Sequence, residues 1–191
     1  MTSKLKTDVL ETVSGSGTIA LTNQLSGMTS ASVPSGSVLQ VISYYTAAQT
    51  AQTLSTSDQV INSMSKVITP LGANSKFLVQ LRWVGEIVSG HDVCFNIQMD
   101  GTRVNSGGGR AFMLGMANLS YHLPNDNSTP ETLNFSTLVS TSSVIGTDIT
   151  FRLVADCGGS NTMYSNRCFG SAPSGGTEGG TSELIITEIK G

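Results

Sequence analysis

Charged side chains are scarce in this 191-residue sequence. Asp, Glu, Lys and Arg make up 12% of the residues, against about 25% in a typical soluble domain. Ser, Thr, Gly and Asn take their place, which is typical of exposed β-structure with its loops and of subunits of large assemblies. The formal net charge is −3, and the few basic residues form no cluster. A nucleic-acid-binding surface is therefore not predicted.

Long apolar runs are absent as well. No run exceeds a few residues, so no segment is predicted to cross or insert into a membrane. The opening residues, MTSKLKTDVLETV, lack the apolar stretch of a secretory signal. If the chain leaves a cell, we expect it to do so by another route, such as assembly into a particle that lysis releases.

Cysteine and histidine are rare, and their spacing indicates neither a disulfide framework nor a zinc site. Cys157 and Cys168 could form one bridge across a hairpin, but we favour unpaired, partly buried thiols for them and for Cys94. The two histidines, His91 and His122, fall in a turn and beside a loop. Surface or subunit contacts are the roles that we expect for them.

No arrangement of acidic residues predicts catalysis. Five carboxylates fall at expected strand ends or in loops, where solvated acids are normal: Asp100, Asp126, Glu131, Asp148 and Asp156. Residues 124–131 lack the spaced acids and central Gly of a calcium loop. Residues 107–110, GGGR, lack a phosphate-binding motif and a following helix. We expect a non-enzymatic protein with no metal and no cofactor.

The strongest structural signal lies in Ser65–Glu86, which reads as strand, turn, strand. Pro70, Gly72 and Asn74 supply turn chemistry. The second half then alternates with the period of two that is typical of a strand buried on one face. The buried face is predicted to contain Phe77, Val79, Leu81 and Trp83, and the other face Lys76, Gln80 and Arg82 with Leu78 and Val84 mixed in. The single Trp is therefore expected in the core.

Further alternating segments recur along the chain. Roughly eight to ten short strands separated by turns at 8–12-residue spacing predict an all-β, antiparallel β-sandwich or jelly roll. Asp100-Gly101 is a strong hairpin signal, residues 46–58 are expected to be a loop or an edge strand, and SELIITEI is expected beside a central strand. The predicted strands that share the alternation of the 65–86 segment are 93–99, 149–155 and 184–189.

The chain divides into two predicted parts. Residues 1–36 form an extended N-terminal arm, which is too poor in apolar side chains to fold alone and is either flexible or ordered by a partner. Residues 37–191 form the sandwich. The tyrosines could form a sugar-stacking surface or line a subunit interface, and the sequence does not decide between these: Tyr44, Tyr45, Tyr121 and Tyr164.

Six pieces of the sequence, in order, span nearly the whole chain: SKLKTDVLETVSGSGTIAL, GSVLQVIS, ITPLGANSKFLVQL, FNIQMDGTRV, ITFRLVADCGGSNTMYSNR and SELIITEI. Their order resembles a virion β-domain of tailed bacteriophages, especially marine and cyanobacterial phages, whose chains are often labelled tail fibre or virion structural proteins. Residues 46–58 and 170–181 depart from the resemblance, so contacts specific to this protein are expected there.

The resemblance implies a location in the virion, an N-terminal particle-binding arm, a tail-fibre-like sandwich and a homotrimer. Other virion proteins of tail or capsid, and a host-surface glycan or protein, are the partners that it implies. Attachment to the particle would involve the apolar residues Leu5, Val9, Leu10, Ile19 and Leu21. A head decoration or cement protein that stabilises the capsid is the alternative function, and a carbohydrate-binding or carbohydrate-active module is a third.

Overall fold

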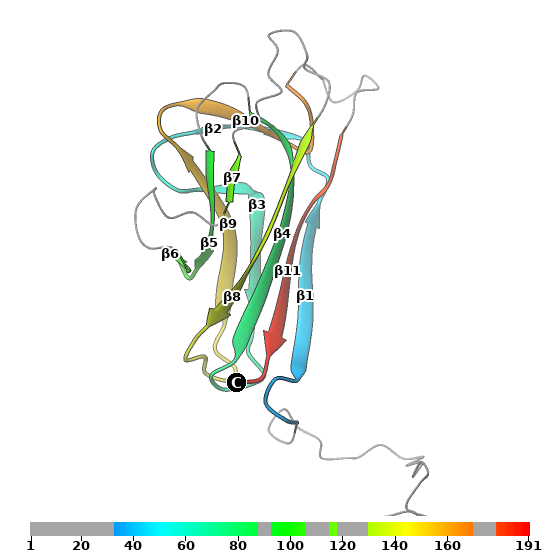
Figure 1. Cartoon of the computed structure of the whole chain (residues 1–191), viewed down its shortest axis with the longest axis vertical. Coiled ribbons are helices and arrows are strands. Elements are labelled where there is room, and N and C mark those ends of the chain that lie inside the picture. Colours follow the sequence, from blue (N-terminus) through cyan, green and yellow to red (C-terminus); the bar gives the residue numbers. More distant parts are fainter. Residues whose placement is uncertain (1–32, 88–92, 106–114, 118–129, 170–178) are drawn as a thin grey trace, which may run out of the picture. The chain divides into compact units, whose positions relative to one another are not determined.

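The computed structural model describes residues 33–87, 93–105, 115–117, 130–169 and 179–191. All regular structure in these residues is β-strand, which confirms the all-β prediction (Figure 1). Residues Pro34–Gly191 form one compact unit. The strands are β1 (Val38–Thr46), β2 (Thr50–Leu54), β3 (Gln59–Ile68), β4 (Lys76–Ile87), β5 (Val93–Met99), β6 (Thr102–Arg103), β7 (Gly115–Ala117), β8 (Glu131–Ser140), β9 (Ile149–Cys157), β10 (Asn161–Ser165) and β11 (Ser182–Ile189).

Two antiparallel sheets make up the sandwich. Sheet A has the order β1-β11-β4-β10-β2, and β8 pairs with β4 along the edge opposite β11. Sheet B has the order β3-β9-β5-β6, and β7 also pairs with β5. The 65–86 segment does not form a hairpin, because β3 belongs to sheet B and β4 to sheet A. Its turn therefore carries the chain from one layer to the other, as connections in jelly rolls do.

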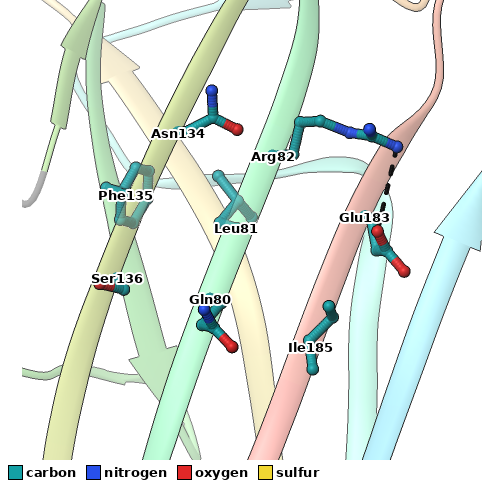
Figure 2. A pocket seen from close by; sticks show the side chains of 8 residues that line it. All are labelled: Gln80, Leu81, Arg82, Asn134, Phe135, Ser136, Glu183 and Ile185. Carbon is teal, nitrogen blue, oxygen red and sulfur yellow. Dashed lines mark ion pairs between the residues drawn. The ribbon is translucent and has the colours of Figure 1, made fainter.

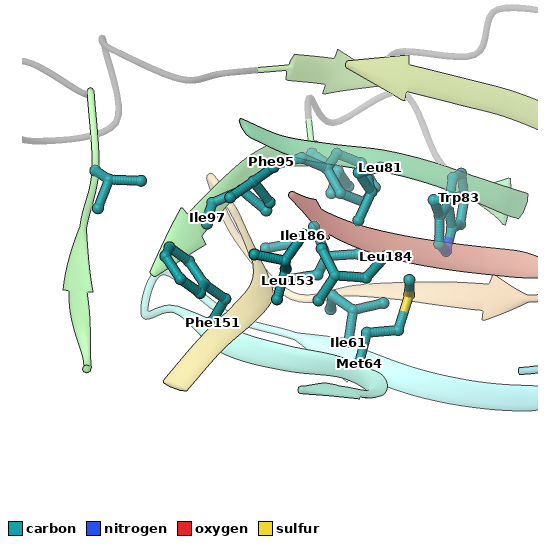
Figure 3. Packing of buried hydrophobic residues seen from close by; sticks show 14 of the residues in the cluster. Ile61, Met64, Leu81, Trp83, Phe95, Ile97, Phe151, Leu153, Leu184 and Ile186 are labelled. Carbon is teal, nitrogen blue, oxygen red and sulfur yellow. The ribbon is translucent and has the colours of Figure 1, made fainter. Parts of the chain in front are cut away.

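Side chains from the inner faces of the two sheets meet in one apolar core (Figure 3). Phe77 of β4 contacts Phe151 of β9 with ring centroids 5.5 Å apart, and Trp83 of β4 contacts Phe95 of β5 at 5.2 Å. The Trp83 indole N–H donates to the hydroxyl of Ser165 at 2.9 Å. Trp83 is fully buried, as predicted, and its one polar group is satisfied.

Several local predictions are confirmed. Asp100 and Gly101 both have positive φ, 48° and 84°, and close the β5–β6 hairpin, as expected for a type I′ turn. Asn74 has φ 53° in the turn before β4. The final strand, β11, lies between β1 and β4, and β2 within residues 46–58 is an edge strand of sheet A. The strands β5 and β9 lie in the opposite layer from β4, not beside it.

A buried carboxylate anchors the turn that leads into β4. Glu188 of β11 is fully buried and accepts hydrogen bonds from the backbone N–H groups of Leu71 and Gly72 at 3.0 and 2.9 Å. The Ser75 hydroxyl and the Gln40 amide also donate to it, at 2.6 and 2.7 Å. Burial raises the pKa of Glu188, but these four donors outweigh burial and the pKa lies below its ordinary value.

A cluster of charged side chains links sheet B to the loop between β2 and β3. The Arg103 guanidinium pairs with Asp58 and with the fully buried Asp156 of β9, and the Gln98 amide donates to Asp58 at 2.9 Å. Burial raises the pKa of Asp58, yet the hydrogen bonds and charge of Arg103 lower it below its ordinary value. Arg103 is suited to this position because its planar fork can serve two carboxylates at once.

At Gly85 of β4, the backbone of Tyr164 and the ring of Trp83 lie closer than a side chain would allow. A Cβ there would lie 2.0 Å from the Tyr164 carbonyl oxygen and 2.4 Å from the Trp83 ring. We expect Gly85→Ala to lower the free energy of unfolding by at least about 2 kcal/mol, since backbone and ring must both move. Denaturant unfolding followed by Trp83 fluorescence measures this loss.

The matched control for that substitution is Gly159→Ala. A Cβ on Gly159 would meet nothing within 4 Å, so we expect a change within about 0.5 kcal/mol. Equal stability of the two variants would contradict the packing described for Gly85.

Glu188→Gln should lower the stability of the protein at pH 7 by about 2 kcal/mol, because hydrogen bonds to a buried carboxylate are replaced by weaker bonds to an amide. A carboxyl with a lowered pKa stabilises the fold above its unfolded pKa and loses this contribution as the pH falls through its folded pKa. The difference in stability between wild type and variant should therefore narrow as the pH falls below 4.5, the ordinary pKa of a glutamate. Denaturant midpoints from pH 3 to pH 8 test this, and a gap that is independent of pH would refute the role of the charge.

Candidate functional site

The outward side of sheet A is a broad surface, which the described residues leave open except at Val84, where Gly180 packs on the side chain. Four strands contribute alternate residues to it, and register places these side chains in rows across the sheet. We call this surface the outer face. It consists of Val38, Val41, Ser43 and Tyr45 of β1, Ile189, Thr187, Ile185 and Glu183 of β11, Lys76, Leu78, Gln80, Arg82 and Val84 of β4, and Ser140, Leu138, Ser136, Asn134 and Thr132 of β8.

Large apolar side chains on the outer face are open to solvent. The exposed fraction is 58% for Val41, 60% for Tyr45 and 48% for Leu138. One row crosses the sheet as Val41, Thr187, Leu78 and Leu138, so its apolar carbon is nearly continuous. A solvated sheet face normally carries polar side chains opposite the core. The outer face therefore has the composition of a contact surface rather than of a face in permanent contact with water.

A shallow hollow of about 380 Å³ lies at the centre of the outer face, over β4, β8 and β11 (Figure 2). The Gln80 and Asn134 amides and the Ser136 hydroxyl supply polar groups around it, and Ile185 supplies apolar surface. The hollow could receive an apolar side chain and at the same time hydrogen-bond a backbone or a hydroxyl group. Its lining is Gln80, Leu81, Arg82, Asn134, Phe135, Ser136, Glu183 and Ile185.

Charge on the outer face is nearly balanced. Arg82 and Glu183 sit side by side on β4 and β11, with the guanidinium and carboxylate 3.9 Å apart (Figure 2). Both side chains are substantially exposed, so this pair contributes little to stability. Lys76, at the end of the face, is its remaining charged side chain. The outer face therefore offers no strong field of either sign to a charged ligand.

Two carboxylates lie near the beginning of β8 and the end of β4. Glu86 accepts a hydrogen bond from the Phe169 backbone N–H. One carboxylate oxygen of Glu131, Oε2, is buried and has no hydrogen-bond partner. Burial, and then the charge of Glu86, raise the pKa of Glu131 above its ordinary value. Ionised Glu131 is therefore a source of instability at neutral pH.

The structure does not gather the predicted tyrosines on one surface. Tyr45 is exposed on the outer face, whereas its neighbour Tyr44 points inward and packs against the core. Tyr164 of β10 contacts the Phe169 ring at 5.4 Å, and the Arg167 guanidinium lies 5.1 Å from its ring centroid. Tyr121 lies outside the described residues. Of the three tyrosines that the structure describes, only Tyr45 thus belongs to the outer face.

Other predicted residues fall outside the described residues as well. These are the candidate attachment residues Leu5, Val9, Leu10, Ile19 and Leu21, the histidines His91 and His122, and the glycines at 107–109. The cysteines are within the described part, where Cys94, Cys157 and Cys168 are all buried and none is part of a disulfide. No disulfide therefore links Cys157 and Cys168.

Most of the outer face was not singled out from the sequence. A signal for it is present in the outward positions of the same strands. Leu78 stands among polar residues there, and Val41 and Leu138 also occupy outward positions. Within the described residues, no group of three or more His, Cys, Asp or Glu side chains is placed to hold a metal ion. The same residues contain no helix long and apolar enough to span a membrane.

Comparison with known proteins adds no family. No protein-family model matches the sequence, and no curated protein sequence matches it. Among solved structures, dimeric latent PorU from Porphyromonas gingivalis is similar over 80% of this chain, with a TM-score of 0.35 and 11% identity. The chain spans 14% of that PorU chain, and a similarity this low carries no argument about function.

Removing the charge of Glu131 should stabilise the protein. We expect Glu131→Gln to raise the denaturation midpoint at pH 7, because the buried, ionised carboxylate beside Glu86 is replaced by a neutral group. A carboxyl with a raised pKa costs stability above its folded pKa and no longer does so once it is protonated. The gain in stability should therefore vanish as the pH falls below 4.5, the ordinary pKa of a glutamate.

Thermal unfolding at pH 4 and pH 7 checks this, with Glu183→Gln as the control. Glu183 is a partly exposed carboxylate in a long ion pair, so its neutralisation should change the midpoint little at either pH. A lower midpoint for Glu131→Gln than for wild type at pH 7 would contradict the prediction.

Proposed function

We propose that this protein is a non-enzymatic structural subunit of a bacteriophage virion, a trimeric fibre- or spike-like module. Its N-terminal residues 1–36 attach it to the particle, and the sandwich presents a surface to the host cell, where a glycan or protein is the ligand. The proposal starts from the order of the sequence pieces that resemble tailed-phage virion β-domains. An all-β sandwich is the fold which that resemblance implies.

The observation that carries the proposal is the outer face of sheet A. It is broad, nearly neutral and open, and it exposes Val41, Tyr45 and Leu138. Surfaces of this composition are typical of proteins that work while bound to other subunits. A subunit of a large particle has such contacts throughout its working life, which also suits a chain with only 12% charged residues.

A capsid decoration or cement protein is the second candidate, because the same face and the same arm could bridge subunits of the head. Copy number separates the two roles. A few trimers in each particle place the protein in the tail, whereas hundreds of copies place it on the head. Quantitative mass spectrometry of purified particles, with labelling in electron micrographs, measures both number and position.

Removing residues 1–30 from the protein should abolish its incorporation into particles while the sandwich remains folded. The physical reason is that residues Pro34–Gly191 form a compact unit with its own core, so the arm is not required for that core. Particles are purified from cells infected by the phage that encodes the chain, and the incorporated protein is measured by mass spectrometry.

Gly159→Ala is the control and should enter particles at the wild-type level, since its Cβ meets nothing within 4 Å. Full incorporation of the truncated protein would refute the role of the arm. Complete absence of the wild-type chain from particles would refute the proposed function as a whole. Release of reducing sugar ends from host polysaccharide by the purified protein would refute its non-enzymatic character.

A further inference from the structure

We infer that the outer face of sheet A is a contact surface between copies of this chain, so its occupant is the sandwich of a second copy. The inference deepens the proposed function, because it rests on the chain being a subunit of an assembly and names the partner for this face. It is argued below from the exposed side chains, the charge, the edge strand and the dimensions of the face.

The exposed apolar side chains on the outer face gain no free energy of burial in a single copy of the chain. Val41 and Leu138 are more than 45% exposed, although inward positions in the same strands, such as Val139, are almost fully buried. Exposed apolar surface favours removal from water by about 25 cal/mol for each Å². Burial against another protein is what would recover this free energy.

The charges on the outer face favour a second copy over a strongly charged partner. Arg82 and Glu183 already neutralise each other, which leaves Lys76 near one end. A partner with a large negative or positive surface would find little to pair with. A second copy of this chain, in which only 12% of the residues are charged, brings few charges that association would have to desolvate.

The edge of the outer face also lacks the usual protection against strand pairing. β8 is ten residues long and runs without a register shift from Glu131 to Ser140, and among the strands of the described residues it pairs only with β4. It contains neither Pro nor Lys, the residues that commonly protect an edge strand. The Asn105 amide donates to the Leu138 carbonyl at 2.8 Å, which covers one point of this edge. A neighbouring copy seated over β8 would shield the rest of it.

The outer face supplies most of the area that a stable contact needs. Four strands about 4.8 Å apart and about eight residues at roughly 3.3 Å each give a flat area of about 500 Å². A standard interface buries about 800 Å² of accessible surface on each partner. Because side chains corrugate the face, its accessible surface exceeds the flat area and supplies most of that requirement. The hollow of about 380 Å³ over β4, β8 and β11 would receive a side chain of the neighbour.

Val41→Glu in the full-length protein tests the inference against Val144→Glu. Val144 is 63% exposed, in the loop between β8 and β9 and off the outer face, whereas Val41 is 58% exposed on it. The two variants therefore add the same charge at equal exposure. Sedimentation velocity over a range of concentrations measures the association state and the dissociation constant of each.

Wild type and Val144→Glu should associate, and Val41→Glu should raise the dissociation constant at least about tenfold, because a carboxylate would be buried without a partner in the contact. Leu138→Glu should do the same from the β8 side. Far-ultraviolet circular dichroism and the buried-Trp emission confirm folding. If Val41→Glu fails to fold, Ser43→Arg replaces it, since Ser43 lies in the adjacent row and makes no core contact.

Three results would overturn the inference. Wild type could be monomeric up to 100 μM, the outer-face variants and Val144→Glu could dissociate alike, or Val41→Glu could lose only its incorporation into particles. The last result would assign the face to a different virion protein. A monomeric wild type would also remove the proposed trimer. The proposed role in the virion is tested separately, because it is read from the presence of the chain in particles and not from its association in solution.

Discussion

β4 is hydrogen-bonded along both of its edges, and the rest of the sandwich depends on this arrangement. β8 pairs with one edge, while β11 and then β10 pair with the other. Its inward side chains, among them Phe77 and Trp83, contact rings of sheet B. Both edges of β4 and its inward side chains are therefore in contact with other strands, and only its outward side chains, on the outer face, remain available. The position of that face is therefore a consequence of how β4 is bound.

The fold could be predicted from the sequence because its main signals are local. Alternation along 76–83 defines which residues face inward, and Asp100-Gly101 defines a hairpin without reference to anything distant. The assignment of strands to layers could not be predicted in this way, since β5 and β9 of sheet B share the same alternation as β4 and β11 of sheet A. Which of them lies beside β4 depends on whether a connection such as residues 69–75 keeps the chain in one sheet or carries it to the other, and the alternation of apolar residues does not record that choice.

The candidate site was predictable only in part, for a related reason. Tyr45 was correctly predicted to lie on a surface. Tyr44 was assigned to the same surface, although adjacent residues of a strand point to opposite faces of the sheet. Val41, Leu138 and Ile185 come from three strands that are distant in sequence, and only their pairing through β4 makes them one surface. Glu188 shows the same limit for stability: its four donors come from β1 and from the turn after β3.

The two ends of the compact unit are joined to each other. The Gly36 backbone N–H donates to the Lys190 carbonyl at 2.9 Å, the Lys190 N–H donates to Ser37, and the Ser35 hydroxyl donates to Gly191. β1 continues from this point in antiparallel register with β11. A pull applied at residue 33 along β1 would therefore load the β1–β11 hydrogen bonds in shear, all together, and not one after another as in a zipper. β1 would thus act as a mechanical clamp that resists force transmitted through the residues before it.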